Sequence, residues 1–237
     1  MTPTMLSRWL LAHALALCAV LWPEMARAGE PPSSVTVSAG MGISVSDATA
    51  KYPEFQVAAD FALGTGIRGR VALELTGLPG DAAIDPKDPA TFRAAGAIVG
   101  LAFACKDAYA YGQDAKGQTA RYVQQRIAVE LVGGTWTRFV TRDAEPRDRF
   151  ASEATAGLRV ERRALAGQVE RFVSVRVGHS GIAAGPNGWA LAVVMEGRAR
   201  VVSIKGAGLD IGARVDKALW GAAGGRDRFA VSVGAGW

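Results

Sequence analysis

The chain has 237 residues, with 27 Lys and Arg against 22 Asp and Glu, and its formal net charge is +5. This length fits one domain of moderate size or a barrel. The charge excess is mild and its residues are interspersed along the chain, which excludes a nucleic-acid-binding stripe and a basic tail. We therefore expect a single domain that binds no nucleic acid.

The N-terminal segment has the pattern of a secretory signal peptide. Arg8 precedes an apolar run from Trp9 to Trp22, and Ala26-Arg27-Ala28 provides a small-residue cleavage site. The run is shorter than the roughly 20 residues that a membrane-spanning helix needs. The sequence thus predicts that residues 1–28 are removed on export and that residues 29–237 form the mature domain.

After this cleavage the chain retains one cysteine, Cys105, and one histidine, His179. A single thiol excludes an intramolecular disulfide and a thiolate metal site, and a single imidazole excludes a multi-histidine metal centre. The glycine-rich pieces follow no strand–helix pattern, so they indicate turns rather than a nucleotide site. We therefore expect neither a metal nor a cofactor.

Alternation of apolar and polar residues with a period of two dominates the mature chain. Near 67–77, for example, Val71 and Leu73 alternate with Arg70 and Glu74. This pattern predicts ten strands, near 34–45, 53–63, 67–77, 92–104, 122–133, 149–162, 168–178, 188–198, 207–217 and 227–237. Long turn-rich connections alternate with short ones between them, which is how outer-membrane barrels are wired.

Two stretches leave the number of strands open. Residues 105–121 fall where a short turn is expected, yet they make a long connection. Gly133-Gly134 could itself be a hairpin turn that splits a long segment. Eight or twelve strands therefore remain alternatives to ten.

The polar face of these strands carries charges of both signs in mid-strand. Inside a narrow barrel such side chains can pair and fill the lumen, while the opposite, apolar face meets lipid. That apolar face is almost free of charge, with Arg171 near a strand end as the main exception. A soluble lipocalin-like carrier would exchange the two faces and remains an alternative. The expected luminal charge network comprises Arg68, Arg70, Glu74, Glu153, Arg159, Glu161, Glu170, Arg176, Asp210 and Arg214.

The last residues, RDRFAVSVGAGW, place Phe229, Val231, Val233, Ala235 and Trp237 on one face. This run resembles the C-terminal signature of bacterial outer-membrane β-barrel proteins, in which a final aromatic residue follows alternating apolar residues. The resemblance implies that the barrel-assembly machinery reads this strand. The general plan resembles small barrels of the OmpA and OmpX kind. It implies an all-β, antiparallel up-and-down transmembrane barrel, a monomer surrounded by outer-membrane lipid and lipopolysaccharide.

One segment, RVGHSGIAAGPNGW, invites a catalytic interpretation. It places His179 beside Ser180, with Glu196 one strand later, and such a trio can activate a hydroxyl for acyl transfer. The segment is similar to the lipid A deacylase barrels, which carry a His-x-Ser pair, an Asn and a later Glu. Here, however, His179 and Ser180 are adjacent, so they face opposite sides of an extended strand. A loop histidine beside a turn serine is the favoured interpretation, and we expect no catalytic residue.

The sequence as a whole predicts a non-enzymatic integral outer-membrane barrel. Its lumen would be narrow or plugged by charged side chains, and its role would lie in the cell envelope or at the surface. The alternatives are a small-solute pore, a lipid A acyl hydrolase using His179 and Ser180, and a soluble periplasmic lipocalin-like carrier.

Overall fold

The protein is described by a computed structural model, which covers residues 34–44, 51–76, 94–113, 117–138, 150–165, 169–180, 190–204, 207–221 and 227–236. The predicted signal peptide, residues 1–28, lies outside these ranges. The elements are β1 (Ser34–Ser44), β2 (Lys51–Gly64), β3 (Ile67–Thr76), β4 (Ala94–Gln113), β5 (Thr119–Arg138), β6 (Phe150–Arg163), β7 (Val169–Ser180), β8 (Ala190–Ile204), β9 (Ala207–Gly221) and β10 (Arg228–Gly236). None of the described residues forms a helix long and apolar enough to cross a membrane.

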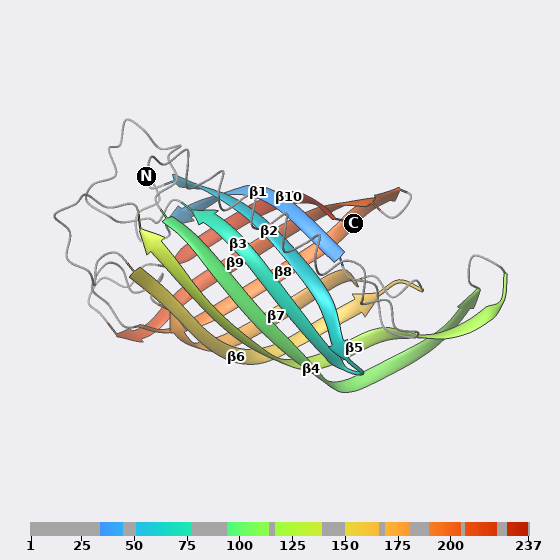
Figure 1. Cartoon of the computed structure of the whole chain (residues 1–237). Coiled ribbons are helices and arrows are strands. Elements are labelled where there is room, and N and C mark those ends of the chain that lie inside the picture. Colours follow the sequence, from blue (N-terminus) through green and yellow to red (C-terminus); the bar gives the residue numbers. More distant parts are fainter. Residues whose placement is uncertain are drawn as a thin grey trace.

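The ten strands close into one barrel (Figure 1). Each strand pairs antiparallel with its neighbours in the chain, and β10 pairs with β1 from Gly236↔Thr36 to Arg228↔Ser44. The prediction of an antiparallel up-and-down barrel of about ten strands is confirmed. Gly133 and Gly134 lie inside β5, opposite Val99 and Ile98, so the alternative hairpin turn at these glycines is wrong.

The two ends of the barrel differ in the length of their connections. At one end, β2–β3 and β8–β9 are joined through only two residues each, 65–66 and 205–206. Gly66 has a φ of 76°, the left-handed conformation that a two-residue hairpin turn requires and glycine tolerates. The connections at the other end are longer, and 77–93 is the longest. We call these the tight-turn end and the loop end.

A hairpin formed by β4 and β5 projects beyond the barrel wall at the tight-turn end (Figure 1, green). Pairing between β3 and β4 stops at Ile67↔Phe103, and pairing between β5 and β6 begins at Gln125↔Arg162. Residues 105–113 and 117–124, the projecting hairpin, thus pair only within β4 and β5, and they extend by roughly 30 Å along the strands. Sequence analysis expected a long connection at 105–121; most of that stretch is strand.

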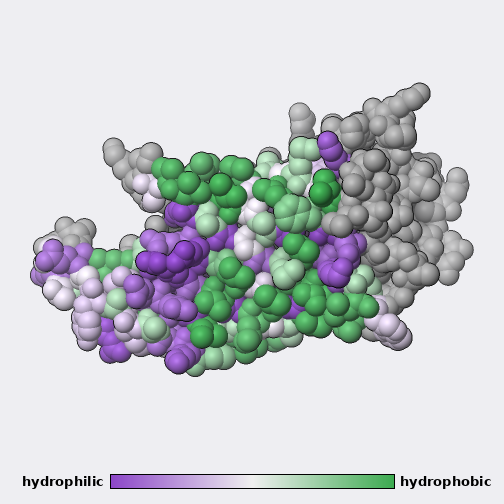
Figure 2. All heavy atoms as spheres, turned by 180° about the vertical axis from the view of Figure 1, so that it is seen from behind, coloured by the Kyte–Doolittle hydropathy of each residue, from purple (hydrophilic) through white to green (hydrophobic). Residues whose placement is uncertain are grey.

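Apolar side chains lie on the outer surface of the barrel, and charged side chains lie inside it. Val175 on β7 and Val233 on β10 are 44 % and 50 % exposed on the outer surface. Glu153 and Arg176 point inward and are only 3 % and 2 % exposed. Figure 2 shows the apolar residues as a broad band over the barrel wall. The predicted orientation, with the apolar face outside and the charged face enclosed, is therefore what the structure has.

Two aromatic residues fill the lumen beside cross-strand glycines. Trp136 lies directly opposite Gly96, and Tyr52 lies opposite Gly42. A Cβ atom at either glycine would overlap the facing ring, so only glycine permits these close approaches. Sequence analysis did not assign Trp136 to the lumen, yet the side chain is fully buried there, in an apolar cluster with Ile98, Val132 and several alanines.

Candidate functional site

The lumen is the candidate functional site, because it gathers most of the charged side chains that the structure describes. Within the described residues, inward-facing arginines and carboxylates are equal in number. The arginines are Arg68, Arg70, Arg126, Arg159, Arg163, Arg176, Arg198, Arg200, Arg214 and Arg228; the carboxylates are Glu54, Asp60, Glu74, Asp107, Glu130, Glu153, Glu161, Glu196, Asp210 and Asp216. A ten-stranded barrel is slightly wider than one that short side chains would fill, and these long side chains occupy the extra width.

Glu130 on β5 is one centre of the network. Its Oε1 accepts a hydrogen bond from Arg159 at 3.0 Å. Its Oε2 accepts hydrogen bonds from Ser174 at 2.5 Å and from Arg176 at 2.9 Å. The two arginines have further partners, since Arg159 also pairs with Glu161 at 2.8 Å. Every oxygen of this buried carboxylate is thus compensated, which a buried charge requires.

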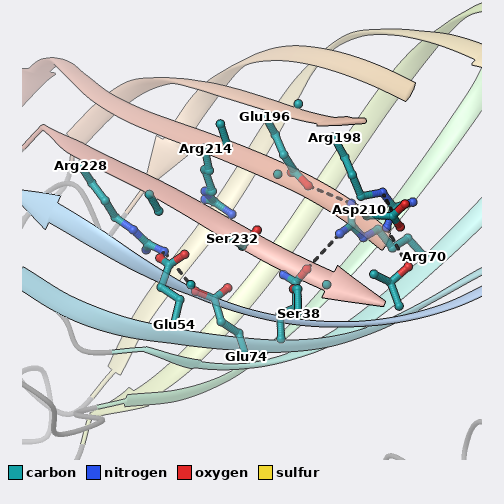
Figure 3. Close-up of a pocket in the computed structure, with 18 residues that line it drawn as sticks. Ser38, Glu54, Arg70, Glu74, Glu196, Arg198, Asp210, Arg214, Arg228 and Ser232 are labelled. Atoms are coloured by element: carbon teal, nitrogen blue, oxygen red, sulfur yellow. Dashed lines mark hydrogen bonds and ion pairs between the residues drawn. The ribbon is translucent and has the colours of Figure 1, made fainter. Parts of the chain in front are cut away.

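Glu196 links opposite walls of the barrel. It stands on β8, and it accepts a hydrogen bond from Arg70 on β3 at 3.0 Å and from Arg176 on β7 at 3.2 Å. β3 and β8 are separated by four strands in either direction around the barrel. The Arg70–Glu196 ion pair therefore crosses the bore. Figure 3 shows both side chains reaching toward each other from facing strands.

A third group lies nearer the loop end, around Arg228 and Arg214. Arg228 on β10 binds Glu54, and it lies 3.1 Å from Glu74 on β3 (Figure 3). Arg214 on β9 donates hydrogen bonds to Asp216 and, at 2.7 Å, to Glu153 on β6. Apart from Arg214–Asp216, which lies within β9, these pairs join strands that are not neighbours, so the side chains meet inside the lumen rather than along one sheet face.

Little space remains between these side chains. A luminal cavity of about 70 Å³ lies against β1, β9 and β10, where small residues such as Ser38, Ser232 and Gly234 line it. A second cavity, between Asp60 and Arg159, has a volume of about 10 Å³. Since about 10–15 Å³ of such volume holds one water molecule, the larger cavity holds about five to seven waters.

One arginine–aspartate ion pair lies where the projecting hairpin leaves the barrel. Arg126 on β5 donates two hydrogen bonds to Asp107 on β4, at 2.7 and 2.8 Å. These bonds lower the pKa of the Asp107 carboxyl below its ordinary value. Further along the hairpin, the Arg121 guanidinium stacks 3.9 Å above the Tyr109 ring.

The predicted luminal residues can now be placed. Nine of the ten point into the lumen; Glu170 does not, since it lies outside and its side chain is 47 % exposed. The reason is a bulge between Arg162 and Arg163, which shifts the register of β7 at Glu170. Sequence analysis left Arg126 and Glu130 out of the predicted network, although the alternation within β5 places both on its inward face.

His179, Ser180 and Glu196 are not brought together. Ser180 is fully buried inside, and Glu196 is held by two luminal arginines. His179 faces outward, where its Nε2 lies 3.0 Å from Ser152 Oγ of β6. The hydroxyl that sequence analysis paired with this histidine therefore lies on the other side of the wall.

The C-terminal strand has its predicted outward face. Val231 and Val233 are 41 % and 50 % exposed, and Ala235 is exposed beside them. Phe229 is half-buried on the same face. Trp237 lies outside the described residues. Every residue of β10 pairs with both β1 and β9, so this strand completes the barrel, and its outer face is wholly apolar.

A closed barrel with an apolar exterior and an enclosed, charge-balanced interior leaves one interpretation of the architecture. The fold is that of a bacterial outer-membrane β-barrel. Within its described residues, this barrel has no group of three or more His, Cys, Asp or Glu side chains positioned to hold a metal ion.

Comparisons with known proteins place few constraints on this outer-membrane-type barrel. No family model and no curated protein matches the chain. Among solved structures, it is similar to the translocator domain of autotransporter NalP from Neisseria meningitidis, with 10 % identity over 100 % of this chain and 99 % of that one, and a TM-score of 0.34. It is also similar to the β domain of the Bordetella autotransporter BrkA, with 14 % identity over 86 % and 98 % of the two chains and a TM-score of 0.32. Scores this low carry no argument, so the fold assignment rests on the strand register of the chain itself.

Proposed function

We propose that the protein is an integral outer-membrane barrel whose lumen is closed by its own ion pairs, with a non-enzymatic role in the envelope. The observation that carries this proposal is the Arg70–Glu196 pair across the bore, supported by the neighbouring pairs of Arg176 and Glu130. Arg70, Arg176, Glu130 and Glu196 each have a partner of opposite sign, so these side chains fill the bore at this level without leaving a charge among them uncompensated. The small luminal cavities support the same conclusion.

The surroundings of the barrel follow from its apolar exterior. We propose that outer-membrane phospholipid and lipopolysaccharide contact this surface, that the barrel-assembly machinery recognises β10 with its apolar outer face, and that the barrel works as a monomer. The exposed valines and leucines favour this setting over a soluble carrier, which would turn them inward. Neither the separation of His179 from Ser180 nor the engagement of Glu196 by arginines favours the acyl hydrolase.

Planar-bilayer recordings test the closed lumen. We expect no steady single-channel steps from the purified, folded barrel. A variant that removes the crossing pair, Arg70→Ser/Glu196→Ser, should open a conducting path, whereas the matched variant Arg162→Ser/Glu170→Ser removes an ion pair from the outer surface and should remain closed. Steady steps from the unaltered barrel would instead establish the small-solute pore.

Membrane location is tested separately. Outer-membrane fractionation, combined with a gel shift between boiled and unboiled samples, should place the folded protein in the membrane fraction. Recovery in the soluble periplasmic fraction would overturn the proposal, and it would favour the carrier.

A further inference from the structure

Two arginines face each other on the outer surface of the barrel, where nearly every other side chain is apolar. Arg162 on β6 pairs in register with Arg171 on β7, and both side chains are exposed. Like charges directly opposite each other in a sheet are unfavourable. Such a pair is tolerated on an apolar wall only where an anion or water can reach it.

The pair marks the edge of the apolar band at the tight-turn end. The next outward pair toward the middle of the wall is Val160↔Val173, and these side chains are 39 % and 59 % exposed. In the other direction, β6 ends at Arg163. Figure 2 shows hydrophilic residues bordering the hydrophobic band on this side of the barrel. The arginines thus lie at the depth where lipid headgroups meet acyl chains.

The carboxylates near this pair do not balance it. Glu170 lies 3.7 Å from Arg162, but both side chains are about half exposed, which makes this a weak contact. Within the described part of the chain, no ion pair to Arg171 is found. One positive charge therefore remains at the site.

Two grooves flank the arginines on the outer surface. One, of about 330 Å³, is bounded by Gln124, Gln125 and Val160 on the β5–β6 side. The other, of about 420 Å³, is bounded by Ala199, Val201 and Ser203 on the β8 side. Both grooves are lined by Arg162 and Arg171, so each combines guanidinium groups with an adjoining apolar wall.

We propose that Arg162 and Arg171 bind the phosphate of an anionic phospholipid, with its acyl chains lying along Val160 and Val173. The planar guanidinium donates paired hydrogen bonds that match phosphate oxygens. A bound phosphodiester relieves the repulsion between the two arginines. Gln124 and Gln125, at the base of the projecting hairpin, provide further donors for the headgroup.

The leaflet follows from the ends of the barrel. Tight turns of outer-membrane barrels lie on the periplasmic side, so this site lies in the inner, phospholipid leaflet rather than in the lipopolysaccharide leaflet. This assignment rests on the proposed membrane location. For that reason, folding and insertion into zwitterionic vesicles are measured first, and failure there counts against the proposed function alone.

Native mass spectrometry of the folded barrel, released from detergent, tests the site. The probes are short-chain phosphatidylglycerol, phosphatidylcholine with the same acyl chains, and inorganic phosphate. We expect phosphatidylglycerol to be retained in preference to phosphatidylcholine. In Arg162→Gln/Arg171→Gln its apparent affinity should fall about thirtyfold, which is what the loss of two arginine contacts to an anionic headgroup amounts to.

A matched variant separates the site from general charge. Lys51→Gln/Lys217→Gln also removes two exposed positive charges, but at the loop end, and it should retain phosphatidylglycerol. Equal retention of both phospholipids, equal losses in the two double variants, or retention in the arginine variant would each overturn the proposal. Inorganic phosphate competing at the same concentration as the lipid would show a free-anion site and reject the lipid.

Discussion

Glu130→Gln removes the charge at one centre of the luminal network while keeping its size. Arg159 and Arg176 would each lose a charged hydrogen bond, at 3.0 and 2.9 Å, and the interior would hold one arginine in excess. Removing one partner of a buried ion pair costs about 3–5 kcal/mol. Here Arg159 retains Glu161 and Arg176 retains Glu196, so we expect the lower end, a loss of about 3 kcal/mol in the free energy of unfolding.

The assay is reversible denaturant unfolding of the barrel in zwitterionic vesicles, followed by the fluorescence of the luminal Trp136. The matched control is Glu170→Gln, which has the same chemistry in an exposed pair and should cost less than about 1 kcal/mol. In a double-mutant cycle with Arg159→Gln, the coupling should be about 1.5–3 kcal/mol, the range for a charged hydrogen bond. If Glu130→Gln proved no more costly than Glu170→Gln, the ion pairs would not hold the lumen closed and the reasoning would be refuted.

Three further predictions concern other parts of the barrel. Gly157→Ala should destabilise strongly or prevent folding, because its Cβ would overlap the Val175 carbonyl oxygen, whereas Gly133→Ala meets nothing closer than 3.9 Å and should unfold at the same denaturant concentration as the parent. Replacing residues 108–125 by Asn-Gly should leave the folded gel shift unchanged, since the described residues of this stretch pair only within β4 and β5, apart from Gln125 at its edge, which also pairs with Arg162; loss of the shift would show that the stretch supports the wall. Because Arg126 depresses the pKa of Asp107, that pair stabilises the hairpin above the ordinary pKa of 3.8 and loses its effect as the pH falls further. Protection of the amides at the hairpin base, measured against the intrinsic exchange rate at each pH, should therefore fall there, and it should be low already at neutral pH in Asp107→Asn.

The sequence was sufficient for most of each strand within the barrel wall and for nearly all of the faces. Alternation in β3, β6 and β9 assigns each side chain to the inside or the outside, and nine of the ten predicted luminal charges are there. Glu170 is the exception because one bulge reverses the parity of the residues beyond it. Period two does not reveal where a strand gains an extra residue.

The partners within the lumen could not be predicted in the same way. Alternation gives a side chain's face but not its height or its neighbour across the bore, and these depend on strand tilt and register stagger. The pairing of Arg70 with Glu196, 126 positions apart, is of this kind. The projecting hairpin was missed for a different reason: outside the barrel wall no face contacts lipid, so strict alternation is not required and the strand signal weakens.

The bore is closed by side chains of the wall itself, with Arg70 and Glu196 meeting near its middle. A separate inserted domain would have to be withdrawn as a unit, which is a slow event. Here a passage requires only that a few torsion angles change, but the largely buried Arg70–Glu196 pair must part first, so each opening is infrequent and ends as soon as the pair forms again. Any leak through the unaltered barrel would then be too brief to resolve as a discrete open level, and it would raise the baseline noise of a recording instead.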